Sequence, residues 1–83
     1  MKKLLKFSAS WCGPCKMLSK TIEQIKSEIP CDIIEIDIDE DFETANKFQI
    51  RSVPTLVLMD GETEVSRKTG NISAAELKNF LKI

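Results

Sequence analysis

Trp11-Cys12-Gly13-Pro14-Cys15-Lys16 is the stretch that decides both the fold and the chemistry of this 83-residue sequence. It follows a short apolar run and begins a helical pattern, so Cys12 is expected at a strand-to-helix junction. Unpaired backbone N–H groups and the helix dipole favour an anion there, which lowers the pKa of a thiol. Cys15 follows one helical turn later, where its sulfur can close a disulfide onto Cys12. Gly13 and Pro14 keep the intervening turn tight. The stretch therefore predicts a redox-active pair, with Cys12 as the nucleophile and Cys15 as the resolving thiol.

A zinc half-site is the alternative explanation for two cysteines at this spacing. Zinc would need a second Cys-x-x-Cys or a pair of histidines to complete its ligands. The sequence has no histidine, and its third cysteine is Cys31. We therefore favour redox chemistry, with no metal or bound cofactor. For Cys31 we favour the role of a small buried apolar residue at the edge of a strand over that of a regulatory thiol.

The composition indicates one ordinary globular domain, residues 1–83. Apolar residues make up 42% and charged residues 30%, and 12 basic against 13 acidic residues give a net charge of −1. A nucleic-acid surface normally needs a basic excess, and a membrane span needs about 18 apolar residues in a row. The N-terminal segment lacks the apolar core of a signal peptide. We expect a cytoplasmic monomer in a reducing compartment that binds neither nucleic acid nor membranes.

The hydrophobic pattern on either side of the cysteines predicts alternating strands and helices. The expected strands cover residues 2–7 (for which a helix is the alternative), 32–39, 54–59 and 62–68, and the expected helices cover residues 13–28, 41–48 and the last ten or so residues. Asp60-Gly61 predicts a hairpin turn, and Ser73 with Glu76 fits a capping box for the last helix, although Asn71 is another candidate cap. The acidic stretch from Asp37 to Glu43 lacks the glycine and the closing glutamate of an EF-hand loop, so we interpret it as the solvated start of a helix. The predicted order is β-α-β-α-β-β-α, in the α/β class.

These features together resemble the thioredoxin family. Residues 11–16 match the family's active-site motif, and Ser52-Val53-Pro54-Thr55 resembles its cis-proline segment. Asp60-Gly61 and Gly70 match the turn and the glycine of its last hairpin. The resemblance covers essentially all 83 residues, without the extra N-terminal strand and helix of ordinary thioredoxins, and the length is closer to that of glutaredoxins and compact archaeal thioredoxins. It implies a compact thioredoxin fold, with a four-stranded mixed sheet flanked by three helices, and protein dithiol–disulfide oxidoreductase activity.

The resemblance also implies which residues bind substrate. A cis Pro54 facing the disulfide would leave the backbone of Val53 free to pair with an extended substrate chain. From sequence alone, a trans Pro54 at the start of a strand would be expected. Trp11 could be core filler, but beside Cys12 we expect it to shield the thiolate and to contact substrate. The remaining expected members of the substrate surface are Gly13, Pro14 and Gly70.

Three hypotheses for function follow from this resemblance. In the first, the protein reduces disulfides of substrate proteins and is re-reduced by a flavin- and NADPH-dependent thioredoxin reductase. In the second, glutathione supplies the electrons, as in glutaredoxins. The Gly-Pro pair between the cysteines, in place of Pro-Tyr, and the lack of a Gly-Gly pair before the last helix argue against a glutathione site. In the third, the domain is a binding subunit and its cysteines are incidental.

Lys6 and Glu35 depart from the family pattern. Thioredoxins usually carry a buried aspartate six residues before the first cysteine and a lysine on the adjoining strand, whereas this sequence has Lys6 and Glu35 there. Ser8 also replaces the usual aromatic residue. If the first two strands are parallel neighbours, we expect Lys6 and Glu35 to be buried as an ion pair beneath the active-site helix. We then expect Glu35 to accept the proton of Cys15 through a water. The alternative is that both side chains reach solvent at strand edges.

Overall fold

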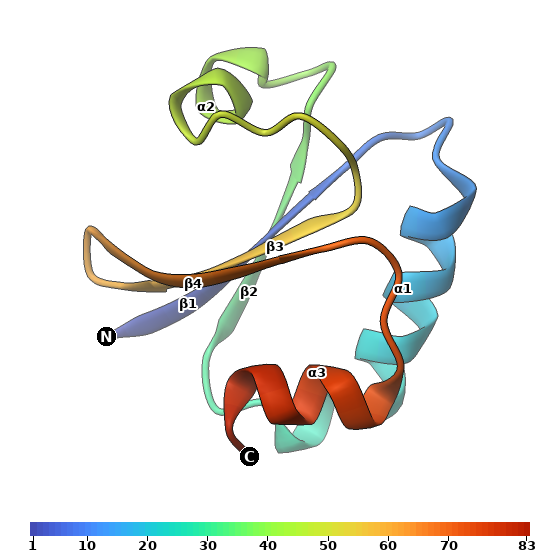
Figure 1. Cartoon of the computed structure of the whole chain (residues 1–83), viewed down its shortest axis with the longest axis vertical. Helices are drawn as coiled ribbons and strands as arrows, with labels where there is room; N and C mark the ends of the chain where they lie inside the picture. The colour runs from blue at the N-terminus through green and yellow to red at the C-terminus, as the bar shows by residue number, and fades with distance from the viewer.

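The computed structural model describes residues 1–83 and contains one mixed sheet of four strands, flanked by helices (Figure 1). The elements in chain order are β1 (Lys2–Ser8), α1 (Gly13–Ile25), a 3₁₀ turn (Lys26–Glu28), β2 (Asp32–Asp37), α2 (Phe42–Lys47), β3 (Thr55–Asp60), β4 (Thr63–Thr69) and α3 (Ala74–Leu81). The strands lie in the order β2-β1-β3-β4. Strand β1 is parallel to β2 and antiparallel to β3, and β4 is antiparallel to β3. The predicted fold class and element order are confirmed.

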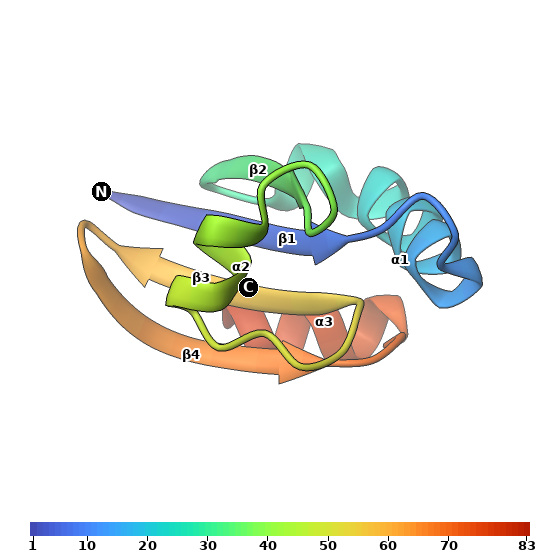
Figure 2. The ribbon, with the colours of Figure 1, turned by 90° about the horizontal axis from the view of Figure 1, so that it is seen from above.

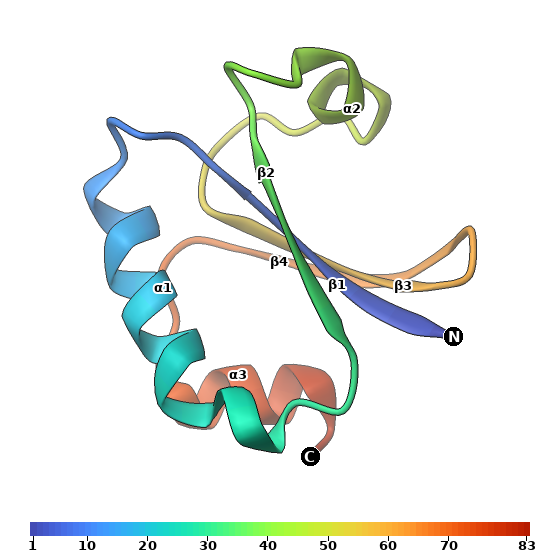
Figure 3. The same cartoon turned by 180° about the vertical axis from the view of Figure 1, so that it is seen from behind.

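The helices form layers on both faces of the sheet. Helices α1 and α3 lie on one side and α2 lies on the other (Figures 1 and 3). Successive side chains of a strand point to opposite faces, so the two central strands supply both cores. Leu4 and Leu56 belong to the core under α1 and α3, whereas Leu5 and Val57 belong to the core under α2. The turn between β3 and β4 lies at the end of the sheet opposite to the start of α1 (Figure 2).

Helix α1 follows the predicted amphipathic pattern. Leu18, Ile22 and Ile25 are buried along one face of the helix, and Ile29 packs against the same core. The predicted helical stretch to Glu28 is present, but its last turn has tightened into the 3₁₀ turn. Pro14 fits because it lies in the first turn, where its missing N–H has no intrahelical partner.

Strand β2 is two residues shorter than predicted: it ends at Asp37 and not at Asp39. The carbonyl of Asp37 accepts hydrogen bonds from the N–H groups of Glu40 and Asp41, at 3.2 and 2.9 Å, which closes a turn. The chain therefore leaves the sheet two residues early and enters α2 through this turn. Asp41 caps α2 by accepting a hydrogen bond from the Thr44 N–H at 3.2 Å. The acidic stretch therefore does form the start of a helix, as predicted.

The terminal hairpin and helix have the predicted turn and cap. Gly61 adopts a φ of 62°, the left-handed conformation that glycine enters at low cost. Ser73 caps α3, and it forms the predicted capping box with Glu76. Helix α3 buries Leu77 against the core. None of the helices is long and apolar enough to cross a membrane.

Candidate active site

Cys12 and Cys15 form a disulfide at the N-terminus of α1. Cys12 is the N-cap residue, in extended conformation, and its Sγ accepts a hydrogen bond from the Cys15 backbone N–H at 3.1 Å. A sulfur in this position interacts with the positive end of the helix dipole. Cys12 is 4% exposed and Cys15 is 2% exposed, so both residues are buried in the oxidised protein. The predicted pairing and its place at a strand-to-helix junction are confirmed.

A cis-proline turn faces the disulfide. The Val53–Pro54 peptide bond is cis, as the resemblance implied, and not trans as the sequence alone favours. The Cys12 Sγ lies 3.7 Å from the Val53 carbonyl oxygen, and no backbone hydrogen bond uses the N–H or the C=O of Val53. The Gly70 N–H donates to the Pro54 carbonyl at 2.8 Å, and its φ of 88° explains why glycine stands there. This turn therefore places an open stretch of backbone beside the sulfur of Cys12.

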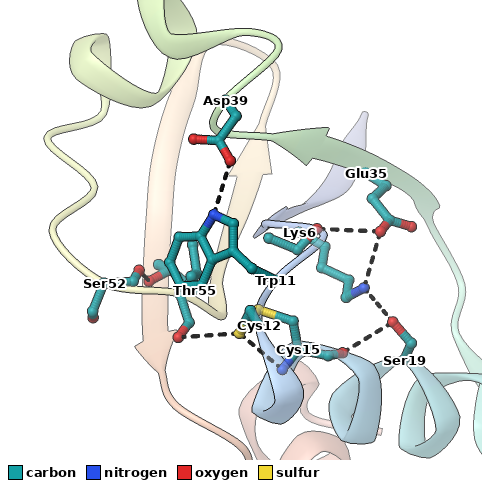
Figure 4. The surroundings of a disulfide bond; sticks show 11 residues. Lys6, Trp11, Cys12, Cys15, Ser19, Glu35, Asp39, Ser52 and Thr55 are labelled. Atoms are coloured by element: carbon teal, nitrogen blue, oxygen red, sulfur yellow. Dashed lines mark hydrogen bonds and ion pairs between the residues drawn. A yellow bond between two sulfur atoms is a disulfide. The ribbon is translucent and has the colours of Figure 1, made fainter.

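Trp11 projects outward beside the disulfide and is 67% exposed, which excludes the role of core filler. Its indole N–H donates to the Asp39 Oδ2 at 2.9 Å (Figure 4). Asp39 is itself held in a turn, where its N–H donates to the Asp37 Oδ1 at 2.8 Å. Sequence reasoning missed Asp39, which it assigned to a solvated acidic stretch. The available signal was that a tryptophan N–H needs an acceptor and that acidic residues follow the neighbouring parallel strand.

Beneath the helix, Lys6 and Glu35 form the predicted ion pair. They are register partners in the parallel strands β1 and β2, and the Lys6 Nζ lies 3.2 Å from the Glu35 Oε1. The prediction that both charges are buried is wrong for Glu35, whose side chain is 64% exposed, against 4% for Lys6. The reason is that β2 is the edge strand of the sheet, so the Glu35 carboxylate reaches solvent beside it.

Two serines complete this group. The Lys6 Nζ also donates to the Ser19 Oγ, and the Ser19 Oγ donates in turn to the Cys15 carbonyl at 3.1 Å (Figure 4). The Ser8 Oγ donates to the Glu35 Oε1 at 3.2 Å. Sequence reasoning missed Ser19, because its position one turn after Cys15 gave no chemical signal without the location of Lys6. Lys6, Ser19 and Glu35 line a cavity of about 390 Å³ between α1 and β2.

The third cysteine lies apart from the disulfide. Cys31 is half-buried just before β2 and packs against the core under α1. Burial, and next the neighbouring Asp32, raise the pKa of the Cys31 thiol. A raised pKa disfavours the reactive thiolate, in agreement with the apolar role. No three potential ligands among Cys, Asp and Glu side chains lie close enough together to hold a metal ion.

Comparison with known proteins matches this site and fold to one family. The family model for thioredoxin matches residues 1–83. A thioredoxin from Buchnera aphidicola is 40% identical over 80 residues, which cover 94% of this chain and 74% of that relative. The chain belongs to the thioredoxin family. A thioredoxin from Chlamydia trachomatis is 41% identical over 68 residues, covering 81% of this chain and 67% of that relative.

Solved thioredoxin structures agree in fold. A mutant thioredoxin from Halobacterium salinarum superimposes with a TM-score of 0.89 at 33% identity, covering 98% of this chain and 72% of that one. Thioredoxin-2 of a malaria parasite gives a TM-score of 0.91 at 27% identity, over 99% and 82% of the two chains. The chain is therefore a dithiol–disulfide oxidoreductase with Cys12 and Cys15 as its active-site pair. Thioredoxins act on disulfide substrates and are generally reduced by thioredoxin reductase.

Proposed function

We propose that Cys12 attacks the substrate disulfide and that Cys15 then resolves the mixed disulfide between Cys12 and the substrate. The Cys12 thiolate displaces one substrate sulfur as a thiolate and forms a mixed disulfide. Cys15, after losing its proton, attacks Cys12, which releases the second substrate sulfur and closes the Cys12–Cys15 disulfide. The observation that carries this assignment is the Cys15 N–H donating to the Cys12 Sγ at 3.1 Å, since it stabilises a thiolate at Cys12.

The substrate chain is proposed to lie over the cis-proline turn. The unpaired N–H and C=O of Val53 can hydrogen-bond an extended peptide, as in the addition of a strand to a sheet edge. Trp11 is exposed and Gly70 is half-buried, so both are proposed to contact substrate, whereas Pro54 is fully buried and is proposed to hold the Val53 backbone in place. Gly13 and Pro14 are exposed in the first turn of α1, where they leave room for the incoming disulfide.

Glu35 is proposed to accept the Cys15 proton during resolution. Its carboxylate is open to solvent and lines the cavity between α1 and β2 together with Ser19, whose hydroxyl bonds to the Cys15 carbonyl. A water on this side of Cys15 is the proposed carrier of the proton. Lys6 holds the carboxylate in place at 3.2 Å. Glu35→Gln should then slow resolution more than the initial attack by Cys12.

We propose a cytoplasmic electron carrier, monomeric, with an NADPH- and flavin-dependent thioredoxin reductase as its electron donor. Reduction by that reductase, and not by glutathione, is expected because the glutaredoxin features of the active-site turn and the last helix are missing from the sequence. Parallel assays of the oxidised protein with NADPH and thioredoxin reductase and with glutathione decide between these donors. Faster turnover with glutathione would favour the glutaredoxin-like alternative.

An insulin-reduction assay tests the roles of the two cysteines. Cys12→Ser should abolish disulfide reduction, and Cys15→Ser should accumulate a mixed disulfide with substrate that mass spectrometry detects. Cys31→Ser is the matched control for loss of a thiol, because Cys31 is not part of the disulfide although it lines the cavity between α1 and β2, and it should keep full activity. Trapping by Cys12→Ser would reverse the assignment. Full biological activity of Cys12→Ser would instead favour a binding subunit.

A further inference from the structure

Lys6 is the only charged residue buried in this protein, with 3% of its surface exposed. A buried ammonium is costly unless it is paired, and an apolar residue of similar size usually fits such a position at no loss of stability. On the same face of β1, Leu4 is fully buried in the apolar core, and Ser8 is buried with its hydroxyl bonded to Glu35. The stability of the fold therefore gives no reason for a lysine at this position.

The ammonium group of Lys6 points toward the active-site helix. It donates to the Ser19 Oγ, and the Ser19 Oγ donates to the Cys15 carbonyl at 3.1 Å (Figure 4). Two hydrogen bonds thus connect the positive charge to the backbone of Cys15, which is 2% exposed. Charges interact more strongly across such a buried region than across water.

Glu35 compensates this charge only in part. Its side chain is 64% exposed, so water and salt screen the carboxylate, whereas the Lys6 side chain is 4% exposed and its charge is screened little. The other charged residues lining the same cavity, Glu23, Lys26 and Asp32, are exposed as well. The charge of Lys6 is consequently compensated mainly on the solvent side, and less on the buried side toward Cys15.

We propose that Lys6, coupled through Ser19, is a positioning residue that sets the reduction potential of the Cys12–Cys15 pair by stabilising its thiolate form. Two glutathione molecules reduce the disulfide to one thiolate and one thiol, with release of glutathione disulfide and one proton. The reduced pair carries a negative charge that the disulfide lacks, so a fixed positive charge favours reduction. This protein is then a weaker reductant than it would be with a neutral residue at position 6. The proposal rests on the redox pair alone and does not require Glu35 to accept a proton.

The test is an equilibrium titration of the Cys12–Cys15 pair against glutathione and glutathione disulfide, read by alkylation and mass spectrometry. Lys6→Met should lower the equilibrium constant for reduction about tenfold, from Coulomb interaction across a partly buried site. That change corresponds to about 30 mV for a two-electron couple. Glu35→Gln should raise the constant, by about threefold, since it removes the opposing charge from the edge strand. Lys20→Met, on the exposed side of α1, should leave it unchanged.

The opposite signs separate an electrostatic role from a structural one, because two structural losses would not move the equilibrium in opposite directions. Glu35 is exposed, so Glu35→Gln tests the proposal even if Lys6→Met folds poorly. An unchanged or increased constant for Lys6→Met, or a decrease for Glu35→Gln, would overturn the proposal. Failure of Glu35 as the proton acceptor would appear differently, as an unchanged rate of resolution with the equilibrium shifts intact.

Discussion

The hydrogen bond between Trp11 and Asp39 should hold the exposed indole in the position where it contacts substrate beside Cys12. Both side chains are exposed, so the 2.9 Å bond from the indole N–H to the carboxylate contributes about 1 kcal/mol, as for an ordinary hydrogen bond and less than for a buried bond to a charged group. Asp39→Ala removes the acceptor and lets the indole leave its position beside Cys12. A loss of about 1 kcal/mol corresponds to about a fivefold change, so kcat/KM for insulin reduction should fall three- to fivefold.

The measurement is the initial rate of dithiothreitol-driven insulin reduction at several insulin concentrations. Glu40→Ala is the matched control, because Glu40 is the exposed acidic neighbour of Asp39 and the Trp11 indole bonds to Asp39 alone. The pH midpoint for alkylation of reduced Cys12 by iodoacetamide should be the same in wild type and Asp39→Ala, since Cys12 keeps its place at the N-terminus of α1. If kcat/KM were equal in Asp39→Ala and Glu40→Ala, the argument that this bond orients Trp11 would be refuted.

Four further predictions concern the thiols, the cap of α3 and the core. In the reduced protein, Cys12 should be alkylated at lower pH than Cys31, because the helix N-terminus favours its thiolate while burial and Asp32 raise the pKa of Cys31; equal midpoints by mass spectrometry would contradict this. Ser73→Ala should lower the free energy of unfolding by about 1 kcal/mol in urea titrations, through loss of the N-cap. Hydrogen bonds from the backbone and hydroxyl of Ser73 lower the pKa of the Glu76 carboxyl in the folded protein. The ionised carboxylate therefore adds its full stability above the ordinary pKa of glutamate, and this stability is lost as the pH falls through the lowered pKa of the folded state. The stability difference between wild type and Glu76→Gln should therefore shrink as the pH falls, and a constant difference from pH 7 to 3 would contradict the linkage. Phe7→Ala should cost about 3–5 kcal/mol, since Phe7 is fully buried and packs against Phe48 with ring centroids 5.6 Å apart; a loss below 1 kcal/mol would show that this core can collapse around the cavity.

The sequence by itself determined the features that depend on local chemistry. Helical spacing of Leu18, Ile22 and Ile25 located α1, and the capping box of Ser73 and Glu76 located α3. The Cys-Gly-Pro-Cys turn placed the disulfide at the start of α1. These predictions succeeded because hydrophobic periodicity, caps and turns act over a few residues, and a linear pattern records them directly.

The tertiary structure decided the features that depend on neighbours far apart in the chain. The cis peptide bond before Pro54 followed only from the family resemblance, since a proline by itself favours trans. The Lys6–Glu35 pair was predictable once parallel strands were assumed, but not the unequal exposure of its two charges, which follows from β2 lying at the sheet edge. Asp39 as the partner of Trp11, and Ser19 as the link between Lys6 and Cys15, are contacts across 28 and 13 residues of sequence. Side chains that meet only when strands and helices are packed together leave no periodic signal, so the fold alone brings these partners to the disulfide.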